Sequence, residues 1–217
     1  MSAAYEVWIR EVFDHPESDP DWCWSEDFDD RWEALGLTAE LMVEYLTRLF
    51  LEPGVLRGYT LGQMARAIWF LVGESSPGQP AHALIWPGAP LAQRVRGVRA
   101  IPSFFGKLVA PAAPGPVDTE ADPFHMACYM WWDVFPSWGR AGCGEPEIHR
   151  ACLEAMEEIL TIPTDLCRIS ALHGLNHWHL NHPAEVHRII DAFLQEGSGL
   201  SEKLREYAQV ARTGCAQ

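Results

Sequence analysis

Residues 38–73 read TAELMVEYLTRLFLEPGVLRGYTLGQMARAIWFLVG and carry the signals of two successive helices. Thr38 is suited to cap the first helix, and Thr60 and Gln63 have the spacing of a capping box at the start of the second. A turn at residues 52–54 separates them, and Gly73 ends the second helix. The apolar residues recur at helical spacing in both: Met42, Tyr45, Leu46, Leu49 and Phe50, then Leu61, Met64, Ala65, Ile68, Trp69 and Val72. Each helix is therefore expected to bury one apolar face in the core of the domain.

The same period continues along the rest of the chain. One apolar stripe runs through residues 91–110 and crosses Pro102, which predicts a kinked or divided helix. A proline-rich linker at 111–122 then leads to an aromatic-rich helix over 124–135, whose apolar residues occupy nearly every face. Four more helices are expected to begin near Pro146, Thr164, Pro183 and Ser201. Because no convincing pair of strands is present, the pattern predicts an all-α fold.

Short links between these helices indicate hairpin succession, with antiparallel helix pairs in an irregular array. A common register is visible in RAIWFL at 66–71, RAIPSF at 99–104 and RISALH at 168–173. A spacing of about 35 to 45 residues per helix pair is typical of an α-solenoid. We therefore expect residues 1–36 to form an acidic, Trp-rich N-terminal arm packed on the domain, and residues 37–217 to form a single all-α domain resembling helical repeats.

The arrangement resembles HEAT or armadillo-type helical repeats. The segments MWWD at 130–133 and SALHGLNHWH at 170–179 are also similar to those of uncharacterised bacterial proteins of comparable length, a resemblance that spans most of the chain. The resemblance implies the fold and brings no activity with it. Helical repeats serve most often as concave binding surfaces, so it also implies a role in protein binding.

The charge of the chain is strongly acidic and unevenly placed. Thirty acidic residues against sixteen Lys and Arg give a net charge of -14 over 217 residues, which argues against nucleic acid and anionic membranes as partners. Residues 11–33 hold ten acids against Arg31 alone, a net charge of 1 − 10 = −9. Four aromatic residues are interleaved with these acids: Trp22, Trp24, Phe28 and Trp32. The segment is either an arm pinned to the domain by its aromatic residues or a contact surface for a basic partner protein.

A cytoplasmic location is expected. Residues 1–13 lack the apolar run of a signal peptide, and the uncharged stretch at 75–93 contains four prolines, so it predicts a loop with short turns and no spanning helix. Six cysteines are dispersed with no Cys-x-x-Cys pair, which favours reduced thiols: Cys23, Cys128, Cys143, Cys152, Cys167 and Cys215.

Histidine is concentrated in one segment, because five of the nine histidines lie within residues 173–187. On a helix starting near Asp165, His173 and His177 are one turn apart and close enough to meet one metal ion. His179 points elsewhere unless the helix ends near Trp178. A third ligand would come from another helix, with Asp133, His125 and His149 as candidates. No His-Glu-x-x-His motif adds a general base.

A hydrogen-bonded polar layer is the alternative interpretation of this segment. Ser170, His173, Asn176 and His177 share one arc of the helix, and Gly174 allows close approach of a neighbour. Asp133 would then be tied to His177, Arg168 or a backbone amide, or else line a cleft as a general base with a raised pKa. The tryptophans near Asp133 are expected mostly in the core, with one lining a groove as a contact anchor. The candidate binding residues are Trp131, Asp133, Trp138, Ser170, His173, Asn176 and His177.

Nucleotide-binding glycine motifs and the Gly-x-Ser-x-Gly elbow are absent. We therefore expect no cofactor and no metal, and a protein-interaction or adaptor function with another, basic protein as partner. An immunity-type protein that neutralises a basic toxin is one variant. The rival hypothesis is a metal-dependent enzyme with a site at His173, His177 and Asp133. The basic segment 91–110 is expected to pair with the acidic arm or with the Glu-rich face of 145–158.

Overall fold

The computed structural model describes residues 3–19, 21–142, 144–197 and 200–216, and this part of the chain is helical without a named strand. The all-α prediction is therefore confirmed. The first half contains α1 (Ala3–Phe13), η1 (Trp22–Trp24), α2 (Phe28–Ala34), α3 (Ala39–Leu51), η2 (Pro53–Gly58), α4 (Leu61–Val72), α5 (His82–Ile85), α6 (Leu91–Arg99), α7 (Ile101–Phe104) and the π-helical η3 (Phe105–Val109). The second half contains α8 (Ala110–Ala112), α9 (Pro123–Tyr129), α10 (Trp131–Val134), α11 (Pro146–Leu160), α12 (Asp165–Trp178), α13 (Pro183–Glu196) and α14 (Glu202–Ala211).

Side-chain caps explain where several helices begin. The Thr38 hydroxyl accepts a hydrogen bond from the Leu41 amide at the start of α3, and Ser201 accepts from the Leu204 amide at the start of α14. Thr60 and Gln63 form the expected capping box of α4. Thr164 stands at the N-cap position of α12 as expected, but its side chain makes no capping bond there.

Two of the predicted helical segments are divided, the one at Pro102 as expected and the one over 124–135 against expectation. Around Pro102, α6 ends at Arg99 and α7 begins at Ile101. The reason is that Pro102 has no backbone N–H group with which to donate an intrahelical hydrogen bond. The helix expected over 124–135 breaks at Met130 into α9 and α10, although no proline lies there. The break matters because it sets the direction of the short α10, which carries Asp133.

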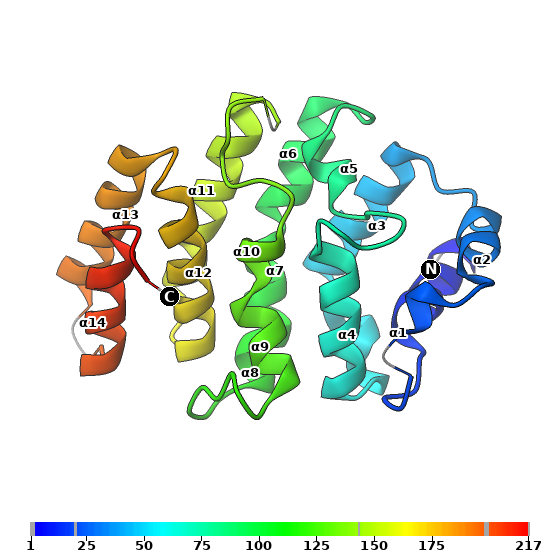
Figure 1. The fold of residues 1–217 in the computed structure, drawn as a ribbon, viewed down its shortest axis with the longest axis horizontal. Helices are drawn as coiled ribbons and strands as arrows, with labels where there is room; N and C mark the ends of the chain where they lie inside the picture. Colours follow the sequence, from blue (N-terminus) through cyan, green and yellow to red (C-terminus); the bar gives the residue numbers. More distant parts are fainter. Residues whose placement is uncertain (1–2, 20, 143, 198–199, 217) are drawn as a thin grey trace.

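Helix contacts follow two series through the molecule (Figure 1). In one series α4 packs on α9, α9 on α12, and α12 on α14. In the other α3 packs on α6, α6 on α11, and α11 on α13. Helix α12 contacts both α10 and α11, and a Cβ on Gly174 would lie 2.5 Å from the Trp132 Cβ and 2.7 Å from the Met156 Sδ. This glycine therefore sets how closely α12 approaches its neighbours.

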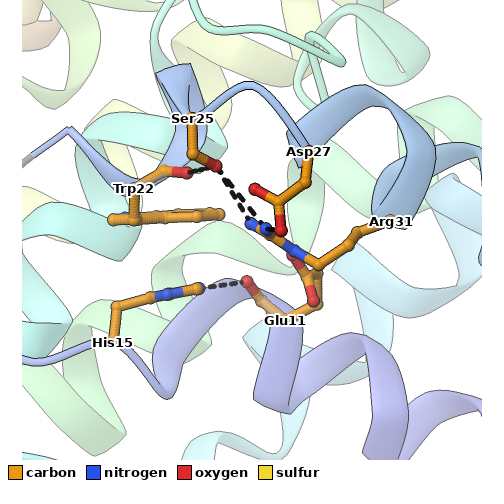
Figure 2. Close-up of polar contacts among 6 residues, drawn as sticks. All are labelled: Glu11, His15, Trp22, Ser25, Asp27 and Arg31. Carbon is orange, nitrogen blue, oxygen red and sulfur yellow. Dashed lines mark hydrogen bonds and ion pairs between the residues drawn. The ribbon is translucent and has the colours of Figure 1, made fainter.

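The N-terminal segment packs on the array through α1, which contacts α4 and buries Trp8 and Phe13. Trp22 and Phe28 are also buried, as expected of pinning residues, whereas the Trp24 side chain is 64% exposed. Figure 2 shows the polar contacts that hold this segment together. Arg31, on α2, pairs with Glu11 on α1 at 2.9 Å and with Asp27.

The basic segment pairs with α11, one of the two partners expected for it. Arg94 is 2% exposed and donates bidentately to the Glu145 carboxylate, as well as to the carbonyl oxygens of Ile85 and Ala89. Arg99 pairs with Glu154 at the surface, 2.7 Å away. The α6 and α11 helices are thus joined by one buried and one exposed ion pair.

No helix in the described residues is both long enough and apolar enough to cross a bilayer. Five of the cysteines are free thiols in the described residues, and Cys143 lies outside them. Burial raises the pKa of Cys128, Cys152 and Cys167, so these three thiols stay protonated and behave as core residues.

Candidate functional site

Three of the predicted site residues converge where α10 meets α12. The Asp133 Oδ1 lies 3.1 Å from the His177 Nε2, and the His177 Nε2 lies 3.3 Å from the His173 Nε2. One donor atom from each residue falls within 4.8 Å of the other two. The one-turn spacing of His173 and His177 places both rings on one face of α12, while the break at Met130 turns Asp133 toward them.

The site is closed on its inner side and open on its outer side. His173 is 5% exposed, whereas the side chains of His177 and Asp133 are 24% and 22% exposed. Burial, with a smaller effect of the neighbouring His177, lowers the pKa of His173 to about 4. His173 is therefore a neutral imidazole at pH 7, which is the protonation state that binds a metal ion.

Two tyrosines form an outer layer behind His173. The Tyr207 hydroxyl, on α14, lies 3.0 Å from the His173 Nδ1 and 3.1 Å from the Tyr129 hydroxyl, and the Tyr129 ring packs against the His173 ring at 4.1 Å. Burial and the Tyr129 hydroxyl raise the pKa of Tyr207, so it stays a neutral phenol. When the Nδ1–H donates to Tyr207, the Nε2 lone pair faces Asp133 and His177.

Trp138 covers the outer side of the cluster. Its ring stacks on His177 with centroids 5.2 Å apart and an interplanar angle of 23°, and its Nε1 donates to the backbone carbonyl of Asp133 at 2.8 Å. Trp138 therefore positions two of the three converging residues at once. It is half-buried, as a residue lining a groove would be.

Ser170 and Asn176 lie on the same arc of α12 but hold other segments. Ser170 donates to the backbone carbonyl of Cys128 at 2.6 Å, which ties α12 to α9. The Asn176 amide makes two hydrogen bonds to the backbone of Ala216, at 3.0 and 2.8 Å, and so anchors the C-terminal segment. Trp131 is fully buried against Phe50, Phe104 and Phe105 and lies in the core, apart from the cluster.

Other candidate partners lie elsewhere. His125 faces Asp122, at 3.8 Å, and His149 packs edge-on to Trp178. Arg168 points to the Leu160 carbonyl, at 3.4 Å, instead of Asp133. His179 follows the end of α12 and faces His187, with their Nε2 atoms 3.1 Å apart.

Tyr207 and Tyr129 were not among the candidates from the sequence. Tyr207 shares an i, i+3, i+4, i+7 stripe with Leu204, Ala208 and Ala211, all buried, so its inward direction was visible in the pattern. Its contact with His173 depends on the packing of α14 on α12. A local sequence pattern does not predict that packing.

A groove of about 650 Å³ runs from the cluster toward the acidic N-terminal segment. Asp133 and Trp138 line one end, Trp22 and Trp24 of η1 contribute another part, and the end of α4 with the loop after it supplies Trp69 and Glu74. The Glu74 amide donates to the Val134 carbonyl at 2.9 Å, which joins this loop to α10. The groove thus reaches the candidate site at Asp133 and Trp138, while His173 and His177 are not among its lining residues.

No family model, curated protein or solved structure matches this chain.

Proposed function

We propose that this protein binds one divalent transition-metal ion, with zinc the best match, between Asp133, His173 and His177, and that the ion serves as a hydrolytic centre. The single observation that carries the proposal is the convergence of two imidazole nitrogens and one carboxylate oxygen within 4.8 Å. Two histidines with one carboxylate, plus an open position, is a common ligand set of catalytic zinc.

The separations match those of zinc ligands. Atoms at about 2.0–2.1 Å from a tetrahedral zinc ion stand about 3.3 Å from one another. The His173 and His177 nitrogens are 3.3 Å apart, and the His177 nitrogen and the Asp133 oxygen are 3.1 Å apart. The third separation, between the Asp133 oxygen and the His173 nitrogen, is at most 4.8 Å, and an ion would draw these two groups toward each other.

A purely hydrogen-bonded layer accounts for the cluster less well. The His177 Nε2 faces both the Asp133 carboxylate and the His173 Nε2, and one proton on it makes a direct bond to one of them at a time. A metal ion instead accepts a lone pair from all three. The Tyr207 hydroxyl at the far nitrogen of His173 is the outer partner that ligating histidines usually have.

The partial exposure of His177 and Asp133 leaves room for a water molecule as a further ligand. A zinc ion held by these three residues would supply a water-derived nucleophile near pH 7, suited to esters, amides or phosphates. The adjoining groove, which Asp133 lines, is where a substrate would approach. Hydrolysis is therefore the reaction class that fits the site.

Calorimetric titration of the metal-stripped protein with Zn²⁺ tests the binding. We expect one ion per chain, and we expect His177→Ala and Asp133→Asn to weaken binding by roughly 100-fold or more, because each removes a ligand. The matched control is His179→Ala, which removes a half-buried histidine outside the cluster. Equal zinc affinity in His177→Ala and His179→Ala would reject the site.

Cobalt substitution tests the open position without knowledge of the substrate. We expect the Co²⁺ protein to show the intense visible bands of four-coordinate cobalt, and azide to change them by displacing water. A spectrum that azide leaves unchanged would show a closed coordination sphere and would contradict a hydrolytic role.

Protein interaction is a second candidate function, favoured by the exposed Trp24 side chain within the acidic segment. An irregular HEAT-like solenoid of antiparallel pairs is the architecture we propose for it, supported by the two series of helix contacts. Such arrays present long surfaces to partners, including the basic toxin that an immunity-type protein would neutralise. Replacing both Asp29 and Asp30 with lysine should abolish binding of a basic partner. Unchanged binding would show that the acidic segment plays no part in this function.

A further inference from the structure

We propose that the groove between the acidic segment and α10 binds an arginine side chain of a basic peptide segment. This inference rests on the protein-interaction function proposed above and names the chemistry of the partner. It needs no metal ion. The residues that carry it are Trp24, Trp69, Trp138, Glu74 and Asp133, which line one groove of about 650 Å³.

The chain itself already places a guanidinium beside two residues of this groove, Trp138 and Glu74. The Arg140 Cζ lies 5.3 Å from the centre of the Trp138 ring, and its Nη2 lies 4.0 Å from the Glu74 Oε1. Both side chains of this ion pair are about half exposed, at 46% and 56%, and 4.0 Å is too long for a direct hydrogen bond. The Trp138 ring and the Glu74 carboxylate can thus contact a cation together, and the Arg140 guanidinium beside them is weakly bound.

Two further tryptophans line the groove, Trp24 largely exposed and Trp69 packed in part against the core. Trp24 is 64% exposed and Trp69 is half-buried, and neither stacks on another ring within the described part of the chain. Exposed tryptophan faces that gather in one groove are the usual components of a cation-binding site. Arginine suits them better than lysine because its planar group stacks on indole.

The segment that carries Trp24 is held in place by the network in Figure 2. The His15 ring stacks on Trp22 at 3.8 Å, and the Ser25 hydroxyl donates to the Trp22 carbonyl at 2.8 Å. Arg31 joins α2 to α1 through Glu11. Trp24 is therefore exposed from a fixed turn, and a ligand loses little freedom of this segment on binding.

The unpaired carboxylates of the acidic segment favour a ligand that is a peptide with more than one basic residue. Arg31 is already paired with Glu11 and Asp27, so it leaves the rest of the acidic segment uncompensated. In the segment that carries Trp24, four acids are exposed and make no ion pair within the described residues: Asp21, Glu26, Asp29 and Asp30. One guanidinium stacks in part of the groove, and neighbouring cations on the same peptide meet these carboxylates.

Calorimetry on the metal-stripped full chain tests the proposal with a defined probe, the peptide acetyl-Ala-Arg-Ala-Arg-Ala-amide. Its citrulline counterpart has the same shape without the charge. We expect the arginine peptide to bind about tenfold more tightly or better, and we expect Trp24→Ala and Glu74→Gln each to weaken it about fivefold. Trp86→Ala, which removes another exposed tryptophan away from the groove, should leave the affinity unchanged.

Arg140→Ala gives the sharpest test because it removes the competing guanidinium. We expect it to strengthen peptide binding about threefold or more, beyond the effect of Arg57→Ala, which removes an equal charge elsewhere on the surface. Equal affinity for the arginine and citrulline peptides, or an Arg140→Ala effect no larger than that of Arg57→Ala, would overturn the proposal.

Two more experiments distinguish the arginine site from the proposed metal site and from a site for a small organic cation. The metal-stripped native chain should bind the peptide, because the groove needs no ion, so a failure of the metal site leaves this result intact. Free argininamide that binds as tightly as the peptide would overturn the choice of a peptide and point to a small organic cation.

Discussion

The protonation of His173 gives a quantitative prediction about stability. In the folded chain burial holds its pKa at about 4, while an unfolded chain has a histidine pKa of about 6.5. Between these two values the unfolded state binds a proton that the folded state does not. Stability should therefore be fully present above pH 6.5, fall as the pH drops toward 4, and level off below it with respect to this group.

The size of the effect follows from the difference in pKa. About 2.5 pKa units at 1.36 kcal/mol each give about 3 kcal/mol of unfolding free energy lost between pH 6.5 and pH 4. The ionisable groups around the ring are His177 on its own helix, Asp133 on α10, Tyr129 on α9 and Tyr207 on α14.

Urea denaturation of the metal-stripped protein at several pH values measures this loss. The control is His173→Gln, which keeps a polar group near Tyr207 and removes the titration. The native chain should lose about 3 kcal/mol more than the variant over this range. Parallel curves for the two proteins would refute the reasoning that His173 is held neutral by burial.

Three other predictions concern the structure around the site. Gly174→Ala places a Cβ against Trp132 and should lower the free energy of unfolding by about 1–3 kcal/mol, measured by calorimetry; an unchanged melting temperature would contradict the close packing of α12. Arg94→Met removes a buried charged donor and should cost about 3 kcal/mol, against about 0–1 kcal/mol for the exposed Arg99→Met in the same denaturation assay; similar losses would contradict the difference in burial. Tyr207→Phe should weaken zinc binding about tenfold or more without removing it, and unchanged zinc affinity in calorimetry would show that this hydroxyl does not support His173.

Much of the fold could be predicted because its signals are local. Thr38, Thr60 and Ser201 cap helices through bonds that span three residues, and apolar stripes show which face is buried. The break at Met130 has no comparable signal, since no proline or glycine lies there. It depends on how α9 and α10 pack against α12.

The candidate site was predictable only where one helix supplies the residues. His173 and His177 lie one turn apart, so their convergence follows from helix geometry. Asp133 was one of several possible partners for them, and only tertiary packing selects it. Trp22 and Trp24 are the same residue type and lie two residues apart, yet Trp22 is buried and Trp24 is exposed. The difference depends on the direction of the short helical turn η1.

Locating the ion in a crystal of the zinc-loaded protein tests the central claim most directly. An anomalous difference map collected at the zinc absorption edge should show one peak about 2.0–2.2 Å from a nitrogen of His173, a nitrogen of His177 and an oxygen of Asp133. A map with no peak between these three side chains, or with the zinc bound elsewhere on the chain, would contradict the account.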